Sequence, residues 1–424
     1  MRLHFLFLFL LPTLAFGQNL KTRYEKTGGK ETATYAECIA FYKQVDQLSD
    51  LIQMKAYGNT DAGFPLHLVL VPPDKDFNIP SQKRKNKRFI FINNGIHPGE
   101  PDGIDASMQL VRDIAEKRKT LPSNVVLAII PVYNVGGMLN RSSNYRVDQD
   151  GPAEFGFRGN AQNYDLNRDF IKVDSRNAKT FTELFHLVDP DVFVDNHVSN
   201  GADYQHVMTL IASQHNRLGG VMGPFMNKQF EPAIYNLMQQ KGFDLVPYVN
   251  HFGETPEKGW SEFWDSPRYS SGYASLWNTF AFVPETHMLK PYPQRVKATY
   301  ALMQSFIEFS TKNSAQITSL RAQQKKTMQT QTSFPLAWKL DRSQHKEITY
   351  KGYASGKKES EVSGLQRLYY DRSKPYEVKV PFYNYYVDTL SVRKPVAYVI
   401  PQGWWKVIEL LQQNGVKLQR LAND

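Results

Sequence analysis

The chain has 424 residues, of which 41% are hydrophobic and 22% charged, and its formal net charge is +10. This composition excludes a wholly disordered or collagen-like chain, and the length predicts a large core and two domains. The single cysteine, Cys38, excludes an internal disulfide, and its helical surroundings predict a buried, unreactive thiol. The basic cluster at 83–88 is interpreted as a solvated loop, with binding to an anionic surface as the alternative. No nucleic-acid module accompanies the cluster, so no nucleic-acid partner is expected.

The first 17 residues, MRLHFLFLFLLPTLAFG, predict a secretory signal peptide. They combine an early positive charge, an apolar stretch of about a dozen residues and the small-x-small site Ala15-Phe16-Gly17. The stretch is too short to span a membrane, and an uncleaved N-terminal anchor is the alternative. We therefore expect a secreted or periplasmic protein with no transmembrane span. We expect it to begin at Gln18 and, since no propeptide is evident, to be made in active form.

Hydrophobic periodicity predicts an α/β fold with a mixed, mostly parallel central sheet flanked by helices. Helices are expected at 31–56, 105–118, from a cap at Asp174 or Ser175 onward, and at 293–313; strands are expected at 67–71, 88–93, 125–132, 192–195, 206–211 and 280–283. Residues 138–170 lack periodicity and predict a long functional loop. Composition changes after residue 315, which predicts a linker at 316–332. A small β-rich accessory domain is expected at 333–424, with a helix at 403–413.

His97 and Glu100 lie in the predicted turn between the apolar strand 88–93 and the next helix. In open α/β sheets, ligands bind just outside the carboxyl ends of strands. An imidazole and a carboxylate supply two of the three protein ligands of a catalytic zinc site. A second His-x-x-Glu pair, His251 and Glu254, follows a loop and introduces no helix, so we interpret it as coincidental.

Two further polar residues follow apolar runs. His197 comes after the strand 192–195, and Glu285 comes after the strand 280–283. Because neighbouring parallel strands end on one rim, we expect these side chains to meet His97 and Glu100 there. The alternative for His197 is a core histidine bonded to a carboxylate, but its place at a strand end favours a ligand.

Together these motifs resemble the zinc carboxypeptidases of the carboxypeptidase A type. The resemblance rests on HPGE in a strand-to-helix turn, DNH at 195–197, Asn-Arg in YDLNRDF at 164–170 and a final Glu after a strand. It covers about residues 30–315 and implies a carboxypeptidase-like catalytic domain at 18–315. It also implies that His97, Glu100 and His197 bind one Zn²⁺, with Asp195 or Asn196 orienting a ligand imidazole.

The resemblance further implies that Glu285 is the general base. It would take a proton from the water that the metal activates and return it to the departing amine. The alternative is a structural carboxylate paired with Lys290 or His287.

Two residues of the YDLNRDF motif are expected to bind substrate. Arg168, with Asn167, would bind the terminal carboxylate of a peptide through the parallel donors of its guanidinium. The alternative is a salt bridge from Arg168 to Asp165 or Asp169.

The resemblance implies two more roles. An arginine would polarise the scissile carbonyl; Arg146 is preferred for this role, with Arg141 as its competitor. A mobile tyrosine, Tyr269 or Tyr273, would cover the substrate.

We therefore expect a secreted zinc metallocarboxypeptidase acting on peptides with a free C-terminal carboxylate. One alternative is a zinc amidase, deacylase or cell-wall stem-peptide hydrolase on the same scaffold. A second is a catalytically silent peptide- or glycan-binding protein that uses the tail domain for recognition. A third is a solute-binding or structural protein whose His-x-x-Glu is accidental. The sequence leaves the preferred terminal side chain and the oligomeric state open.

Overall fold

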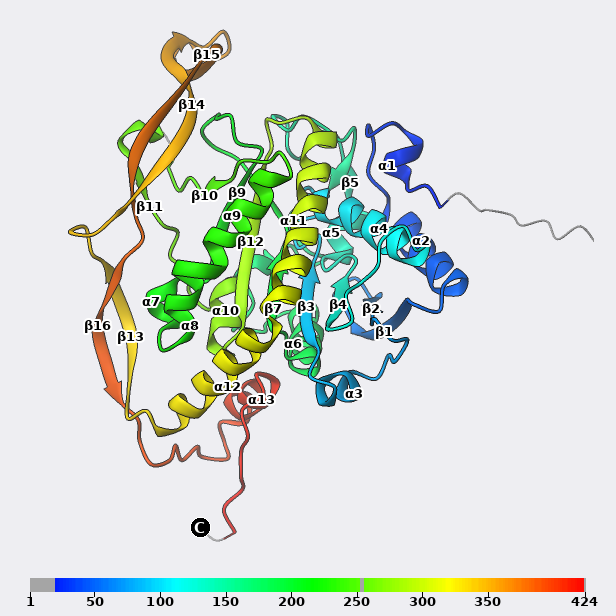
Figure 1. Cartoon of the computed structure of the whole chain (residues 1–424), viewed down its shortest axis with the longest axis vertical. Coiled ribbons are helices and arrows are strands. Elements are labelled where there is room, and N and C mark those ends of the chain that lie inside the picture. The colour runs from blue at the N-terminus through cyan, green and yellow to red at the C-terminus, as the bar shows by residue number, and fades with distance from the viewer. Residues whose placement is uncertain (1–19, 252–254, 423–424) are drawn as a thin grey trace, which may run out of the picture.

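The computed structural model describes residues 20–251 and 255–422, so the predicted signal peptide and Glu254 lie outside the described residues. Its main feature is a sheet in the order β1-β2-β4-β3-β7-β12-β9-β10 (Figure 1). Strand β8 pairs with β12 beside this path. The strands of this sheet are β1 (Gln53–Asn59), β2 (Pro65–Val71), β3 (Arg88–Asn93), β4 (Val125–Ile130), β7 (Val192–Asp195), β8 (His197–Ser199), β9 (Met208–Ala212), β10 (Val246–Pro247) and β12 (Phe280–His287).

The middle of the sheet is parallel. β3 lies between β4 and β7 and is parallel to both, and β12 continues this arrangement beside β7. β2 and β9 run antiparallel to β4 and β12 on either side. The predicted mixed, mostly parallel sheet flanked by helices is confirmed. The carboxyl ends of β3, β7 and β12 consequently lie next to one another at one edge of the sheet.

The two faces of the sheet carry separate hydrophobic cores, because successive side chains of a strand point in opposite directions. On β3, Ile90 and Ile92 belong to one core and Phe89 and Phe91 to the other. Helices α2 (Tyr35–Leu48), α4 (Asp102–Ala115), α9 (Glu231–Gln240) and α11 (Tyr292–Lys312) contribute to the first core. Helices α6 (Arg176–Val188) and α10 (Ser270–Leu276) contribute to the second.

The other elements are short or belong to the C-terminal part. Before residue 314 they are α1 (Arg23–Lys26), α3 (Ile79–Arg84), α5 (Val135–Leu139), the pair β5 (Arg141–Ser142) and β6 (Phe155–Gly156), the short helical turns at Leu166–Arg168, Met226–Phe230 and Pro256–Lys258, α7 (His215–Leu218) and α8 (Met222–Phe225). Most of 138–170 is therefore loop, as predicted. The predicted helix 31–56 is too long, since α2 ends at Leu48 and β1 begins at Gln53.

Strand β12 is longer than the predicted strand 280–283, so Glu285 lies within it rather than after it. Residues 280–282 pair with β7, and residues 285–287 pair with β8. Pro284, which lacks a backbone donor, lies between these two pairing regions, where the ladder on that side is interrupted. The strand can therefore pass through a proline and carry Glu285 to the edge of the sheet.

The C-terminal part forms two small antiparallel arrangements beside the main sheet (Figure 1). Strand β14 (Lys346–Glu359) pairs with β15 (Gln366–Tyr383), and β15 also pairs with β11 (Trp260–Ser261). Strand β13 (Ser333–Leu340) pairs with β16 (Tyr386–Arg393), and helix α13 (Trp405–Gln413) follows. β-structure in the tail and its closing helix were both expected.

The segment expected to be a linker forms helix α12 (Ser314–Thr330), which packs on the main body. Arg321, on its buried side, lies 2.7 Å from Asp191 Oδ1 and 2.7 Å from Asp189 Oδ1, and donates to the Asn278 carbonyl. Asp191 also binds Arg88, at 2.9 Å. A buried carboxylate between two guanidinium groups therefore ties α12 to the start of β3.

The remaining sequence predictions concern the thiol and the basic cluster. Cys38 is buried, as predicted, and burial raises the pKa of its thiol. In the basic cluster, Lys85 pairs with Asp74 and Asp76, each at 2.8 Å. None of the helices within the described residues combines the length and apolar character needed to cross a bilayer.

We predict that Arg321→Met lowers the free energy of unfolding by about 2–4 kcal/mol, because it removes one of the two guanidinium groups that bind the buried Asp191. Lys325→Met, one turn further along α12, removes only the exposed pair with Asp189 and is expected to cost less than about 1 kcal/mol. Urea denaturation of both variants measures the difference. Equal shifts of the two midpoints would contradict the prediction.

Candidate metal centre and its cavity

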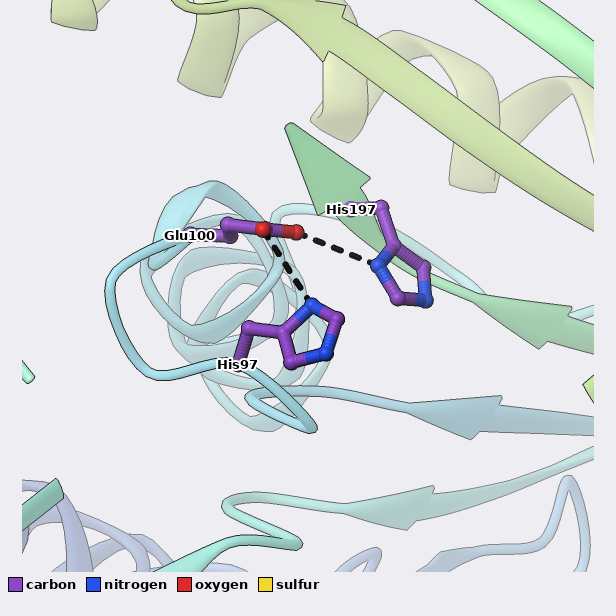
Figure 2. A group of neighbouring side chains, drawn as sticks. All are labelled: His97, Glu100 and His197. Carbon is purple, nitrogen blue, oxygen red and sulfur yellow. Dashed lines mark hydrogen bonds and ion pairs between the residues drawn. The ribbon is translucent and has the colours of Figure 1, made fainter. Parts of the chain in front are cut away.

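Three side chains meet at the carboxyl ends of β3 and β7 (Figure 2). His97 and Glu100 come from the turn between β3 and α4, and His197 is the first residue of β8. His97 Nδ1 lies 3.2 Å from Glu100 Oε1, and His197 Nδ1 lies 3.1 Å from Glu100 Oε2. The potential ligand atoms all lie within 4.8 Å of one another, and all three residues are buried. The sequence prediction that these residues meet is confirmed.

Close backbone packing brings the two ligand-bearing segments together. Gly103, in the first turn of α4, leaves no room for a side chain: a Cβ there would lie 2.5 Å from the Asn196 Cβ and from Asn94 Oδ1. Asn196 Nδ2 in turn donates to Asn94 Oδ1, at 2.8 Å. The turn after β3 and the junction of β7 with β8 therefore touch directly, which sets the separation of His97 and His197.

The outer nitrogen of each imidazole contacts a carboxylate. His97 Nε2 lies 3.0 Å from Asp165 Oδ1, and His197 Nε2 lies 3.1 Å from Asp195 Oδ2. Asn93 Nδ2 donates to the other oxygen of Asp195, at 2.9 Å. Such carboxylate partners fix the ring orientation and the tautomer of a metal-binding histidine. Of the two orienting residues considered from sequence, the one in contact with His197 is Asp195, because Asn196 points to Asn94.

The surroundings of Glu100 keep its carboxyl group ionised, as a metal ligand must be. Burial raises the pKa of Glu100, but His97, Arg146 and hydrogen bonds from both imidazoles outweigh it and hold this pKa well below its usual range. Arg158 Nη1 lies 3.3 Å from His97 Nδ1 and 3.7 Å from Glu100 Oε1, so a positive charge already lies close to the converging ligands. Two imidazoles and one carboxylate form the donor set of a catalytic zinc site, and the residues present therefore fit a zinc ion.

Glu285 faces the same centre from β12. Its Cα is in register with His197 of β8, and the two residues line one cavity. The pKa of Glu285 is raised to about 7, chiefly by burial and also by the nearby Glu100 carboxylate, against the lowering effect of His197. The alternative partners are engaged elsewhere: Lys290 pairs with Asp203, and His287 Nε2 lies 2.7 Å from the Ala202 carbonyl oxygen. A carboxyl group with a pKa near neutrality is suited to accept and return a proton.

A cavity of about 320 Å³ extends from the metal centre. Besides the three candidate ligands and Glu285, it is lined by Arg146, Arg158, Asn167, Arg168, Val198, Ser199, Asn200, Ile211, Tyr248, Phe263, Tyr269, Ser270, Ser271 and Val283. Val283 and Ile211 are cross-strand partners on β12 and β9, and Val283 lies on the same face of β12 as Glu285. The cavity therefore combines a polar centre with an apolar floor.

Arg168 reaches this cavity without a carboxylate of its own. Among the described residues, no carboxylate lies within 4 Å of its guanidinium, which donates to the Asn167 carbonyl and lies over the Tyr269 ring, 4.6 Å from its centroid. Within the part of the chain that the structure describes, the predicted alternative salt bridges from Arg168 to Asp165 or Asp169 do not form. Asp165 instead binds His97 and Arg158, and Asp169 accepts a hydrogen bond from Ser175. Arg168 is thus available to an anion in the cavity.

Comparison with known proteins shows which family part of this chain resembles. Residues 38–219 match the sequence model of the zinc carboxypeptidase family. The matched residues make up less than half of the chain, and over them the sequence is similar to that family. The matched segment contains all three candidate zinc ligands, together with Asn167 and Arg168, whereas Glu285 lies beyond it.

The zinc carboxypeptidase match is accompanied by distant individual relatives. The chain is 26% identical over 137 residues to a probable carboxypeptidase 2 of Trichophyton verrucosum, covering 32% of this chain and 23% of that protein. The chain thus spans less than a quarter of the length of that curated relative. Among solved structures, the metallo-carboxypeptidase of Burkholderia cenocepacia gives a TM-score of 0.47 at 16% identity, covering 65% of this chain and 68% of that one. Carboxypeptidase A of Helicoverpa armigera gives 0.49 at 12% identity, with coverages of 68% and 74%.

The arginines differ in their positions around the candidate metal centre. Arg146 donates to Glu100 Oε1, Gln149 Oε1 and the Val198 carbonyl, at 2.7, 2.8 and 2.9 Å. Arg158, which sequence reasoning missed, binds Asp165 and is 46% exposed, against 17% for Arg146. Arg141 is not among the lining residues and donates to two backbone carbonyls outside the cavity.

Of the two tyrosines considered as covers of the substrate, Tyr269 lines the cavity. Tyr273 is buried in the second core, with its hydroxyl 3.2 Å from His186 Nε2. Tyr248 also lines the cavity and was not predicted, because no motif surrounds it. His251 is not among the lining residues, in keeping with its interpretation as coincidental.

We predict that Asp195→Asn lowers the zinc affinity about 10- to 100-fold, because the amide keeps the shape of the carboxylate but removes the charge behind His197. Competition with a fluorescent zinc chelator measures this affinity. Asp105→Asn is the matched control: Asp105 is buried on α4, binds Tyr292, and has a pKa that burial raises to about 7. An unchanged affinity in Asp195→Asn would show that Asp195 does not support the ligand.

Proposed function

We propose that the chain is a secreted, zinc-dependent metallocarboxypeptidase that hydrolyses C-terminal peptide bonds. The observation that carries this proposal is one cavity lined by the three candidate zinc ligands, by Glu285 and by Arg168. Hydrolysis of a terminal peptide bond needs these groups together: a metal centre, a base, and a cation that binds the terminal carboxylate. Secretion rests on the N-terminal sequence alone.

One zinc ion held by His97, Glu100 and His197 would act as a Lewis acid and lower the pKa of water toward ~7. Glu285 in its carboxylate form takes a proton from the attacking water. The peptide C–N bond breaks after the water oxygen has added to the carbonyl carbon, and the protonated Glu285 gives its proton to the departing amine. The products are a shortened peptide and a free amino acid.

Substrate orientation is assigned to two neighbouring residues. Arg168 would bind the terminal carboxylate of the peptide through two parallel hydrogen bonds. Asn167 supports this role, because its side-chain oxygen is buried and, among the described residues, has no hydrogen-bond partner. A ligand with a donor group, such as the amide N–H of a peptide, would satisfy that oxygen.

A cation beside the scissile carbonyl would stabilise the negative charge that develops on its oxygen. Arg146 lines the cavity, but it already donates to three acceptors, and this geometry supports a role in holding Glu100. Arg158 is more exposed to the cavity, so we assign to it the larger share in stabilising negative charge on the carbonyl oxygen. Tyr269, on the same wall as Arg168, is the candidate to cover the substrate.

We predict that Arg168→Ala lowers kcat/KM for a free-acid peptide at least 100-fold, because the terminal carboxylate loses its only proposed cationic partner. An amidated peptide lacks this carboxylate and should be a poor substrate of both proteins. Arg176→Ala, an exposed arginine on α6, is the control and should leave kcat/KM unchanged. Cleavage of both peptides is followed with and without a chelator.

The same assay separates the alternatives. Equal cleavage of free-acid and amidated peptides, tolerated by Arg168→Ala, would indicate an amidase or deacylase. No cleavage despite one equivalent of bound zinc would indicate a binding protein.

We predict that Glu285→Gln lowers kcat about 10²- to 10⁴-fold while zinc content stays at one equivalent, since the amide can neither accept nor return a proton. Glu231→Gln, a buried glutamate on α9 that accepts from Tyr235, is the matched control. Steady-state kinetics and metal analysis of both variants test this. Retention of more than a tenth of the activity in Glu285→Gln would remove Glu285 from the mechanism.

A further inference from the structure

The β14–β15 hairpin is joined to the catalytic part through a shared strand. β11 (Trp260–Ser261) lies parallel to the end of β15, with Trp260 in register with Phe382 and Ser261 with Tyr383. The Glu262 N–H donates to the Tyr383 carbonyl, at 2.9 Å. The next residue is Phe263, which lines the substrate cavity. The backbone of this cavity wall is therefore hydrogen-bonded to the C-terminal region.

Trp260 connects the hairpin to a second cavity residue. Its side chain is buried, and its ring lies 5.5 Å from the Tyr350 ring of β14 and 6.1 Å from the Phe382 ring of β15. Its indole Nε1 donates to the Tyr248 carbonyl, at 2.9 Å. Tyr248 lines the cavity together with Phe263. One tryptophan thus anchors the backbone of Tyr248 against the hairpin.

The contact has its own hydrophobic core, separate from the two cores of the main sheet. The catalytic part and the hairpin contribute to it jointly: Ala202, Tyr204, Val246, Val249 and Trp260 from the first, and Tyr350, Val380 and Phe382 from the second. These side chains are buried or nearly buried and come from both parts, so the contact is a packed core rather than a loose docking of two modules.

The same core supports a third part of the cavity. Gln205 Nε2 donates to the Gly352 and Tyr376 carbonyls of the hairpin, at 2.8 and 3.0 Å. The Tyr204 hydroxyl lies 3.3 Å from Ser199 Oγ, and Ser199 lines the cavity two residues after His197. Contacts with the hairpin therefore reach the cavity from two sides, through residues 199–206 and through Tyr248 and Phe263.

We propose that the β14–β15 hairpin supports one wall of the substrate cavity from outside and thereby sets the affinity of the cavity for substrate, rather than serving as an independent accessory domain. The inference rests on the proposed function only in taking a peptide as the ligand of the cavity. The hairpin contacts neither the candidate zinc ligands nor Glu285 in any hydrogen bond or ion pair formed among the described residues. Disturbing it should therefore change binding and leave the chemical step largely intact.

The test is a change made entirely within the hairpin. In Tyr350→Leu, we expect KM and Kd for an N-blocked dipeptide with a free C-terminal phenylalanine to rise at least fivefold, with kcat changed less than twofold and one zinc retained. Tyr369→Leu is the matched control, because Tyr369 lies on β15 and its ring faces Lys358 rather than the cavity. Trp260→Phe keeps an aromatic ring but removes the donor to Tyr248, so it repeats the test without opening the core.

The outcomes distinguish the two proposals. If the dipeptide is bound but not cleaved, the proposed peptidase activity is overturned. If its Kd nevertheless rises in Tyr350→Leu, the proposed role of the hairpin in substrate binding is supported. Unchanged KM and Kd in both Tyr350→Leu and Trp260→Phe would contradict the proposed role of the hairpin in substrate binding, whether or not the wild-type protein cleaves the dipeptide. A kcat that falls while KM stays constant also contradicts it.

Discussion

The candidate site depends on one buried carboxylate, that of Glu100. Its two oxygens contact different imidazoles, and it also accepts from Arg146 and from the Val198 N–H, the latter at 2.9 Å. An ionised carboxylate is stable in the core only where cations or donors surround it. The turn after β3, the start of β8 and the loop that carries Arg146 must therefore converge on this group. The same convergence creates a set of donors for a divalent cation.

The opposite face of the sheet keeps the metal-binding turn in register with the proposed base. Glu285 points into the cavity, and Thr286, the next residue of β12, points to the other side. There its hydroxyl donates to Asp102, which also lies 3.1 Å from Arg295 Nε. Asp102 follows Glu100 by two residues. A buried network behind the sheet consequently links the strand of the base to the turn of the ligands.

The predictable features were those that depend on local patterns. Apolar runs locate the strands, and strand ends locate His97 and His197, because parallel strands share a rim. Arg158, and the contact of Asp165 with His97, were missed because both residues lie in a long loop without periodicity, where a side chain's direction depends on distant contacts. The pairing of β11, which contains Trp260, with β15 could not be predicted for a similar reason. Its partner strand lies more than a hundred residues later in the sequence, and a strand of two residues has no recognisable pattern.

The charges lining the cavity give the substrate a direction. Arg146 is neutralised by Glu100, and Arg158 by Asp165, whereas Arg168 has no carboxylate partner among the described residues. An anionic group entering the cavity therefore gains most beside Arg168, where it meets a cation without having to displace another carboxylate. On the proposed function, that group is the terminal carboxylate of the peptide. With the carboxylate of the substrate held beside Arg168, the last peptide bond of the substrate would extend toward the candidate metal centre. The distribution of ion pairs in the cavity would therefore select this bond for hydrolysis.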